Sequence, residues 1–204
     1  MSATPTITES GARVRPASIR TLLLWMLSFL AIPIAGYLGT FLVGRVDNFS
    51  SALLGGALVG AIVGFAQALA SRRRLNRLSW TVSTALGTSV GVALGTLAVS
   101  YRTSLAALIV AGLITGAVVG LAQALALPRM TAGLRWLWVP VTTILWALAW
   151  AVTTLAGITV EEQFIVFGAS GAFVYSLLAG LTLLVLRVPT SPKVHTVGNA
   201  QPER

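Results

Sequence analysis

Charged residues divide this chain into long uncharged stretches of nearly constant length. Six stretches contain no Asp, Glu, Lys, Arg or His: 21–44, 48–71, 78–101, 103–128, 136–160 and 163–186. Each is long enough for a membrane-spanning helix, because about 20 apolar residues cross roughly 30 Å of hydrocarbon. The pattern predicts an all-α, polytopic transmembrane bundle of six helices, with spans at about 21–44, 51–71, 79–100, 104–127, 136–158 and 163–186.

Composition supports a chain whose surface faces lipid. Hydrophobic residues make up 56% of the sequence and charged residues 9%, against about 25% charged in soluble domains. The mean hydropathy is +0.87, and the absence of cysteine excludes disulfides and thiolate metal sites. The polar, proline-containing ends predict disordered tails at 1–19 and 188–204, so the transmembrane domain is expected at 20–187.

The distribution of Lys and Arg predicts the orientation of the spans. Of the 14 basic residues, only Arg45 and Arg102 fall in connections on the side opposite the two termini. Cytoplasmic loops carry an excess of Lys and Arg, so both termini are expected in the cytoplasm. The basic residues are spread over helix ends, whereas a nucleic-acid partner needs them gathered on one face. We therefore expect no nucleic-acid partner.

A segment rich in small residues occurs twice. The sequence GGALVGAIVGFAQALA at 55–70 returns as AGLITGAVVGLAQALA at 111–126. A shift of 56 residues aligns Gly60 with Gly116, Gly64 with Gly120, Gln67 with Gln123 and Trp80 with Trp136, and a further shift of 55 aligns Gly116 with Gly171 and Gln123 with Leu178. The chain is therefore predicted to contain three tandem two-helix repeats of 55–56 residues, all entering the membrane from the same side.

Glycines recur at every fourth position within these segments. The stripes comprise Gly56, Gly60 and Gly64 in the first copy and Gly112, Gly116 and Gly120 in the second. Spacing by four places the glycines on one helix face, and membrane helices use such faces for close backbone contact. We expect a helix-packing surface, and a glycine-lined pore or ligand groove is the alternative.

Each copy also carries one amide side chain near its end, Gln67 in the first copy and Gln123 in the second. An amide inside a membrane needs a hydrogen-bond partner. We expect these side chains to bond across helices, either to each other or to a backbone carbonyl; the alternative is a polar contact for a passing solute. The third copy has Leu178 at this place, so a complete ring of amides is not expected.

Two tryptophans of the fifth span form a further candidate site. Trp146 and Trp150 are four residues apart and share one helix face. Such a pair packs against lipid or within the bundle core, and the alternative is a face for a flat apolar ligand such as a quinone or carotenoid. The other tryptophans begin the odd-numbered spans, where aromatic side chains anchor at the membrane interface.

Two local sequence patterns predict a kink in one helix and the start of another. Pro33 lies inside the first span and predicts a kink there. Thr159 and Glu162 form a capping-box pattern, which predicts that the sixth helix begins beside them.

No Asp, Glu, Lys, Arg or His occurs within any predicted span. Intramembrane hydrolases need a base or a metal beside the nucleophile, and ion-coupled transporters bury ionisable groups along their pathways. The spans also lack the His that haem or chlorophyll would need. We therefore expect no enzymatic activity, no cofactor and no metal.

The repeated motifs resemble a known kind of protein. GAIVGFAQALASRRR and GAVVGLAQALALPR, followed by LSWTVSTALG and LRWLWVPVTT, are similar to Gly-rich bacterial membrane proteins built from GxxxGxxQ-type hairpins. Those hairpins often carry Trp after the Gln, where this chain has Ala68 and Ala124. The resemblance covers about 20–187 and implies a polytopic protein of the bacterial cytoplasmic membrane, without implying an activity.

Two kinds of function remain open from the sequence. The first is a non-enzymatic structural role, or association with membrane lipids or with other membrane subunits. The alternative is a passive or partner-driven carrier, or the substrate-binding subunit of a transporter, for an uncharged small solute.

Overall fold

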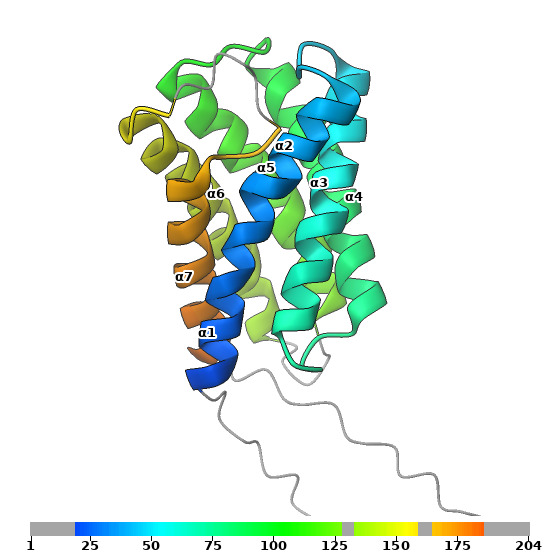
Figure 1. Cartoon of the computed structure of the whole chain (residues 1–204), viewed down its shortest axis with the longest axis vertical. Coiled ribbons are helices and arrows are strands. Elements are labelled where there is room, and N and C mark those ends of the chain that lie inside the picture. The colour runs from blue at the N-terminus through cyan, green and yellow to red at the C-terminus, as the bar shows by residue number, and fades with distance from the viewer. Residues whose placement is uncertain (1–18, 128–132, 159–164, 186–204) are drawn as a thin grey trace, which may run out of the picture.

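A computed structural model describes residues 19–127, 133–158 and 165–185, and all regular structure within them is helical (Figure 1). The elements are α1 (Ile19–Leu27), η1 (Ser28–Leu30), α2 (Ala31–Val43), α3 (Phe49–Ala70), α4 (Arg77–Ala98), α5 (Leu105–Ala126), η3 (Leu134–Leu137), α6 (Trp138–Leu155) and α7 (Ala169–Val185). Because α1, η1 and α2 follow one another directly, they form a single rod. The prediction of an all-α bundle of six helical rods is confirmed.

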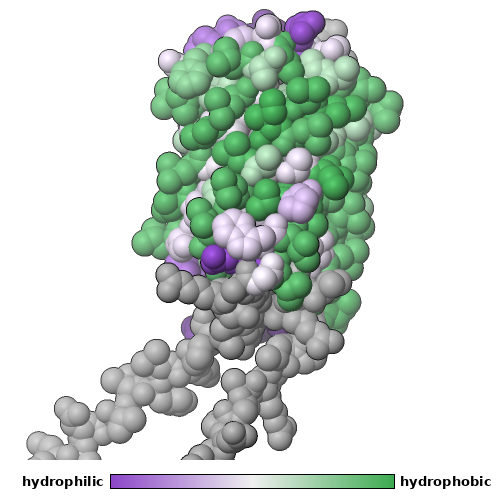
Figure 2. Space-filling model, turned by 180° about the vertical axis from the view of Figure 1, so that it is seen from behind, coloured by the Kyte–Doolittle hydropathy of each residue, from purple (hydrophilic) through white to green (hydrophobic). Residues whose placement is uncertain are grey.

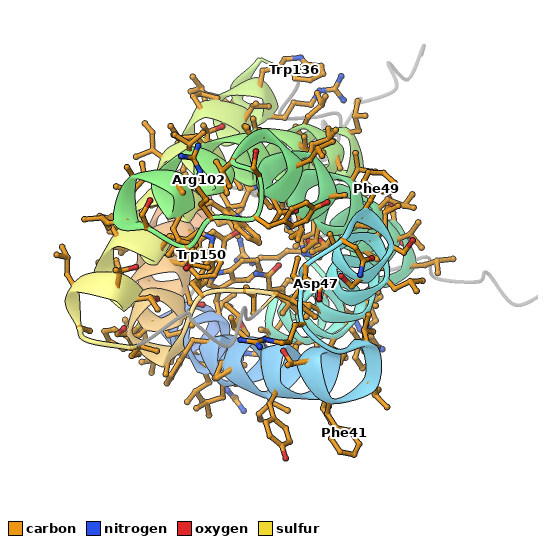
Figure 3. The ribbon with its side chains drawn as sticks, turned by 90° about the horizontal axis from the view of Figure 1, so that it is seen from above. Phe41, Asp47, Phe49, Arg102, Trp136 and Trp150 are labelled. Carbon is orange, nitrogen blue, oxygen red and sulfur yellow. The ribbon has the colours of Figure 1, made fainter. Side chains whose placement is uncertain are left out.

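The six rods stand side by side in chain order and close into a ring. Each rod packs against the next along the chain, and the ring closes where α7 packs against α1 and η1. Figure 3 looks along the bundle: Phe41 and Trp136 point away from its centre, whereas Trp150 lies toward it. The contacts of α3, α4, α5 and α6 with one another are the most extensive, and those of α7 with α1 and α2 are looser.

The two ends of the bundle differ in charge. One end holds the start of α1, the α3–α4 turn and the end of α7. We call it the basic end, because these described arginines lie there: Arg20, Arg72, Arg73, Arg74, Arg77 and Arg135. The opposite end, called the far end, carries Arg45, Asp47 and Arg102 in the α2–α3 and α4–α5 connections.

The outer surface is suited to lipid. Five helical segments are long and apolar enough to cross a membrane, namely Ile19–Val43, Phe49–Ala70, Arg77–Ala98, Leu105–Ala126 and Leu134–Leu155, and a shorter apolar helix follows at Ala169–Leu184. Hydrophobic residues cover most of the face drawn in Figure 2, with hydrophilic residues at its upper end and a few more in its lower part. The chain is a multi-pass membrane protein.

Side-chain caps define where three of the helices begin. The Asn48 side chain accepts a hydrogen bond from the Ser51 backbone N–H at 2.9 Å and starts α3. Asn76 does the same for α4 through the Ser79 N–H, also at 2.9 Å. Ser104 caps α5. Each cap satisfies one of the backbone donors that the first turn of a helix leaves unpaired.

The predicted kink at Pro33 takes the form of a short, tighter turn. Proline has no backbone N–H, and its ring crowds the carbonyl group four residues earlier, which here belongs to Phe29. Phe29 lies within η1, the 3₁₀ turn between α1 and α2. The hydroxyl of Ser28 donates to the Trp25 carbonyl oxygen at 2.6 Å within this turn.

The prediction that the sixth span begins near residue 163 is wrong. Helix α7 begins at Ala169, and Ile165, Val166 and Phe167 before it are non-helical and buried. Non-helical backbone is tolerated at membrane depth where protein surrounds it. A helix would spread three consecutive apolar residues over different faces, whereas this segment buries all three. The capping-box residues Thr159 and Glu162, and the predicted tails apart from Ile19, lie outside the described residues.

Candidate functional site

The glycine stripes lie at helix crossings with no space to spare. A Cβ added at Gly60 would lie 2.6 Å from the Thr84 carbonyl oxygen, and one at Gly116 would lie 2.6 Å from that of Thr142. The two glycines therefore make the same contact, α3 on α4 and α5 on α6. The other stripe glycines are equally crowded by the neighbouring helix: Gly56 by Thr88, Gly64 by Thr84, Gly112 by Trp150 and Ala147, and Gly120 by Val139.

The two amides bond across helices, as one of the sequence hypotheses states, but their partners are tryptophans. Trp80 Nε1 donates to Gln67 Oε1 at 3.1 Å, which joins α4 to α3. Trp138 Nε1 donates to Gln123 Oε1 at 2.8 Å, which joins α6 to α5. Gln123 also donates through Nε2 to Thr84 Oγ1 at 3.0 Å. All of these side chains are buried.

The tryptophan that matches Trp80 is Trp138, so the sequence alignment with Trp136 is wrong. Trp136 is 44% exposed, and the Arg135 guanidinium lies 4.9 Å from the centre of its ring. Gln67 and Trp80 are 13 residues apart, whereas Gln123 and Trp138 are 15 apart. Two extra residues in the α5–α6 connection therefore displaced the alignment.

A third tryptophan joins these two at the basic end. The ring centres of Trp25 and Trp80 are 6.4 Å apart, and those of Trp80 and Trp138 are 6.2 Å apart. Trp25 Nε1 differs from the other two donors, because it is buried and has no hydrogen-bond partner among the described residues. All three indoles are thus buried at the basic end, but only Trp80 and Trp138 donate a hydrogen bond to an amide.

The junction between α7 and α1 has no amide side chain that could pair with Trp25. Helix α7 packs against α1 where α3 packs against α4, and its residue equivalent to Gln67 and Gln123 is the fully buried Ala179. Leu178, which the sequence alignment placed there, is only half-buried. A uniform shift of 56 from Gln123 reaches Ala179. Alanine carries no acceptor for an indole N–H, so the third junction has no amide bond.

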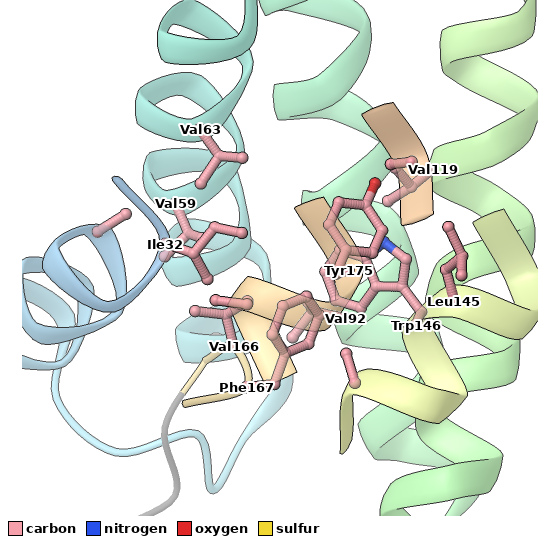
Figure 4. Packing of buried hydrophobic residues seen from close by; sticks show 14 of the residues in the cluster. Ile32, Val59, Val63, Val92, Val119, Leu145, Trp146, Val166, Phe167 and Tyr175 are labelled. Carbon is pink, nitrogen blue, oxygen red and sulfur yellow. The ribbon is translucent and has the colours of Figure 1, made fainter. Parts of the chain in front are cut away.

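Trp146 and Trp150 belong to the core at the centre of the ring, which agrees with the packing interpretation of this pair. Phe167 packs against both, with ring centres 5.0 Å from Trp146 and 6.0 Å from Trp150. Tyr175 lies 6.3 Å from Trp146 in the same cluster (Figure 4). Phe167 thus occupies the aromatic face that a flat ligand would need.

A small cavity lies between this cluster and the two amides. Gln67, Thr84, Gln123, Trp146 and Tyr175 are among its walls, and the space open to the centre of a water molecule is about 20 Å³. The Tyr175 hydroxyl lies near Gln67 and Trp146, yet Trp146 Nε1 has no hydrogen bond with acceptable geometry. One water molecule needs about 10–15 Å³ by this measure, so the cavity suits a single water.

A larger opening, the lateral groove, lies between α2 and α7. Its walls are Pro33, Gly36, Tyr37, Ile158, Val166, Phe167, Gly168 and Ala169, and it holds about 150 Å³ by the same measure. None of these side chains is charged. Tyr37 is exposed at its rim and stacks on Phe41, with ring centres 6.4 Å apart. The groove therefore opens on the apolar outer wall of the bundle.

Metal-binding side chains do not gather in the part of the chain that the structure describes. Among residues 19–127, 133–158 and 165–185, no group of three or more His, Cys, Asp or Glu side chains lies close enough to hold an ion. Asp47 is the single carboxylate within these ranges, and it lies at the far end.

No protein-family model matches this chain, and neither the curated proteins nor the solved structures gave a similar chain. The resemblance to Gly-rich bacterial membrane proteins therefore stays a prediction.

Proposed function

We propose that this chain is a non-enzymatic, multi-pass protein of the bacterial cytoplasmic membrane that acts by holding a lipid acyl chain in the lateral groove. One observation carries the proposal. The groove holds about 150 Å³, against about 20 Å³ in the central cavity and about 40 Å³ in the pocket at the far end. Of these three spaces, the groove alone has room for several methylene groups.

The interior offers little space for another role. The glycine stripes are closed by backbone contacts, and the Gln67 and Gln123 amides already bond to tryptophans. Polar groups that are satisfied within the protein hold helices together in a membrane. These contacts support a structural role for the stripes and amides. A ligand-binding site is therefore expected on the outer wall of the bundle.

The chemistry of the groove favours hydrocarbon as its occupant. Its walls lack charge, and the exposed aromatic rings of Tyr37 and Phe41 stand beside it on α2. Apolar clefts with few polar groups bind apolar ligands. In a membrane-spanning wall, the most abundant such ligand is a lipid tail.

The arrangement of charge supports an orientation with both termini in the cytoplasm. Six described arginines lie at the basic end and two at the far end, and cytoplasmic ends carry the excess of Lys and Arg. Reporter fusions after Asp47 and Arg102 are expected to report the outside of the membrane, and a fusion after Arg74 the inside. The reverse pattern would refute this orientation.

Filling the groove tests the lipid proposal. Ala169 is exposed in the first turn of α7 and lines the groove, so Ala169→Trp is expected to displace the acyl chain. Ala106 is exposed in the first turn of α5 at the same end and provides the matched control, Ala106→Trp. After purification in mild detergent, native mass spectrometry should show one fewer retained phospholipid in Ala169→Trp only. Equal lipid retention in the two variants would overturn the proposal.

A carrier for an uncharged solute is the second candidate, favoured by one observation. Trp146 lines the central cavity, and its Nε1 has no hydrogen-bond partner among the described residues. Swelling of proteoliposomes in glycerol or urea separates the two functions. Our proposal predicts swelling no faster than in empty vesicles, and faster swelling that is lost in Gln123→Leu would favour the carrier.

A further inference from the structure

A pocket at the basic end lies where α1, the α3–α4 turn and α7 meet. It holds about 30 Å³, and its walls include Leu22, Trp25, Arg74, Leu75, Gly180 and Leu183. Trp25 is 3% exposed, and its buried Nε1 has no hydrogen-bond partner in the part of the chain that the structure describes. The Trp25 atom nearest to a Cβ built on Gly180 is Cδ1, at 2.8 Å, and Cδ1 is bonded to Nε1. The donor edge of this indole therefore lies against Gly180, which is also a wall of the pocket.

The unpaired indole N–H of Trp25 differs from those of Trp80 and Trp138, which both have acceptors. A buried donor without an acceptor loses free energy relative to one that is satisfied. Trp80 and Trp138 avoid this loss through Gln67 and Gln123, whereas Trp25 packs against Gly180 of α7. The acceptor for Trp25 is then expected to come from a molecule that enters the pocket.

One arginine lines the same pocket, and two more precede it in the chain. Arg74 lines it, and partial burial lowers the pKa of the Arg74 guanidinium from its ordinary value. The preceding Arg72 and Arg73 adopt φ values of 51° and 71°, in a left-handed region that non-glycine residues rarely occupy. Three consecutive arginines in one tight turn concentrate positive charge beside the pocket. Pockets of this kind between membrane helices attract anionic lipid headgroups.

We propose that this pocket binds an anionic phospholipid, whose phosphate contacts Arg74 and whose ester carbonyl accepts the hydrogen bond from Trp25 Nε1. This proposal rests on the lipid-binding function proposed above and assigns a second site, at the other end of the bundle from the lateral groove.

The depths of the two protein groups match the two lipid groups. Arg74 lies in the turn beyond the end of α3, and Trp25 lies within α1, beside Trp80 in the first turn of α4. In a phospholipid, the ester carbonyls also lie deeper than the phosphate. Leu22 and Leu183 then contact the first methylene groups. Inorganic phosphate supplies the anion but has no carbonyl to reach Trp25.

Native mass spectrometry with phosphatidylglycerol, phosphatidylcholine and inorganic phosphate tests the site. The variants are Trp25→Phe, which keeps an aromatic ring but removes the donor, and Arg74→Gln. The control is Arg73→Gln, which removes the same charge from an exposed position in the same turn. We expect phosphatidylglycerol to bind more tightly than phosphatidylcholine. Trp25→Phe and Arg74→Gln should each weaken its binding about 10-fold, the effect of one lost hydrogen bond to a charged or buried group.

Several results would overturn the proposal. Phosphatidylglycerol could bind Trp25→Phe as tightly as the unmodified chain, or Arg73→Gln could weaken binding as much as Arg74→Gln. Competition by inorganic phosphate would identify a site for free anions instead. If Trp25→Phe does not fold, unchanged binding in Arg74→Gln still refutes the site. Any of these results, obtained while Ala169→Trp still loses a lipid, would reject this site and leave the groove proposal standing.

Discussion

The α3–α4 and α7–α1 junctions place a tryptophan against a helix of small residues in the same way, yet only the first gives that indole a partner. Trp80 donates to Gln67, and the α5–α6 junction repeats this bond between Trp138 and Gln123. At α7–α1, Ala179 and Gly180 leave Trp25 Nε1 unpaired beside a pocket. The same packing surface thus closes a junction when an amide is present and leaves a cavity when it is absent.

The two openings that we propose bind lipid lie at the looser junctions. The pocket beside Trp25 and the lateral groove both border α7, on the side that faces the α1–α2 rod. The helices from α3 to α6 make the most extensive contacts and contain the glycine stripes and both amides. We infer that α3 to α6 form the scaffold, and that the wall formed by α1, α2 and α7 carries the binding sites.

Breaking a closed junction at its glycine should have the largest effect. Gly60→Leu and Gly116→Leu each force a side chain against a threonine carbonyl oxygen that lies 2.6 Å from the Cβ position. Backbone cannot yield as a flexible side chain can, so we expect a loss of about 3 kcal/mol in stability, seen as a lower melting temperature in detergent. Gly133→Leu is the control, because nothing lies within 4 Å of its Cβ position. Equal losses at all three glycines would contradict the packing role.

Removing the amides should have a smaller effect and should distinguish the two closed junctions. Gln123 makes hydrogen bonds to two side chains, Trp138 and Thr84, which lie on two other helices, whereas Gln67 makes one to Trp80 and lies near the Tyr175 hydroxyl. Gln123→Leu is therefore expected to cost about 2 kcal/mol and Gln67→Leu about 1 kcal/mol. Thermal unfolding in one detergent gives both values. A larger loss for Gln67→Leu would show that the Thr84 bond adds nothing.

Much of the fold could be predicted from the sequence because lipid constrains it strongly. Uncharged stretches set the number of rods, and the four-residue spacing of the glycines around Gly60 and around Gly116 identified the packing face. The start of α7 could not be predicted, because Ile165 to Phe167 form an uninterrupted apolar run that suits a helix and a buried non-helical segment equally. Only the surrounding bundle distinguishes the two.

The candidate site was predicted in part. Gln67 and Gln123 were correctly expected to bond across helices, but their indole partners were missed because the two connections differ in length by two residues. The position in α7 that corresponds to Gln67 and Gln123 was predicted one residue too early, at Leu178 instead of Ala179. Leu178 and Ala179 are neighbours in a stretch of small and apolar residues, so sequence similarity alone cannot fix the register there. Burial fixes it, since only Ala179 is fully enclosed.

Converting the open junction into a closed one should give the smallest effect on stability. Ala179→Gln supplies an amide where Gln67 and Gln123 stand in the other junctions, so Trp25 gains an acceptor. We expect a gain of about 0.5–1 kcal/mol in lipid-free detergent, together with weaker phosphatidylglycerol binding. Ala179→Leu adds similar bulk without an acceptor and should give no gain. If the Leu variant is stabilised as much as the Gln variant, the effect comes from filled space and the comparison of junctions fails.

The indole N–H signals of Trp25, Trp80 and Trp138 test most directly whether Trp25 lacks the acceptor that the other two indoles have. Their ¹H–¹⁵N resonances can be recorded in phosphatidylcholine nanodiscs and again after phosphatidylglycerol is added, with Trp25→Phe assigning the first. The account predicts that the Trp25 proton moves downfield as it gains a carbonyl acceptor, while the amide-bonded Trp80 and Trp138 protons stay in place. A Trp25 signal that ignores phosphatidylglycerol, or three signals that move together, would contradict it.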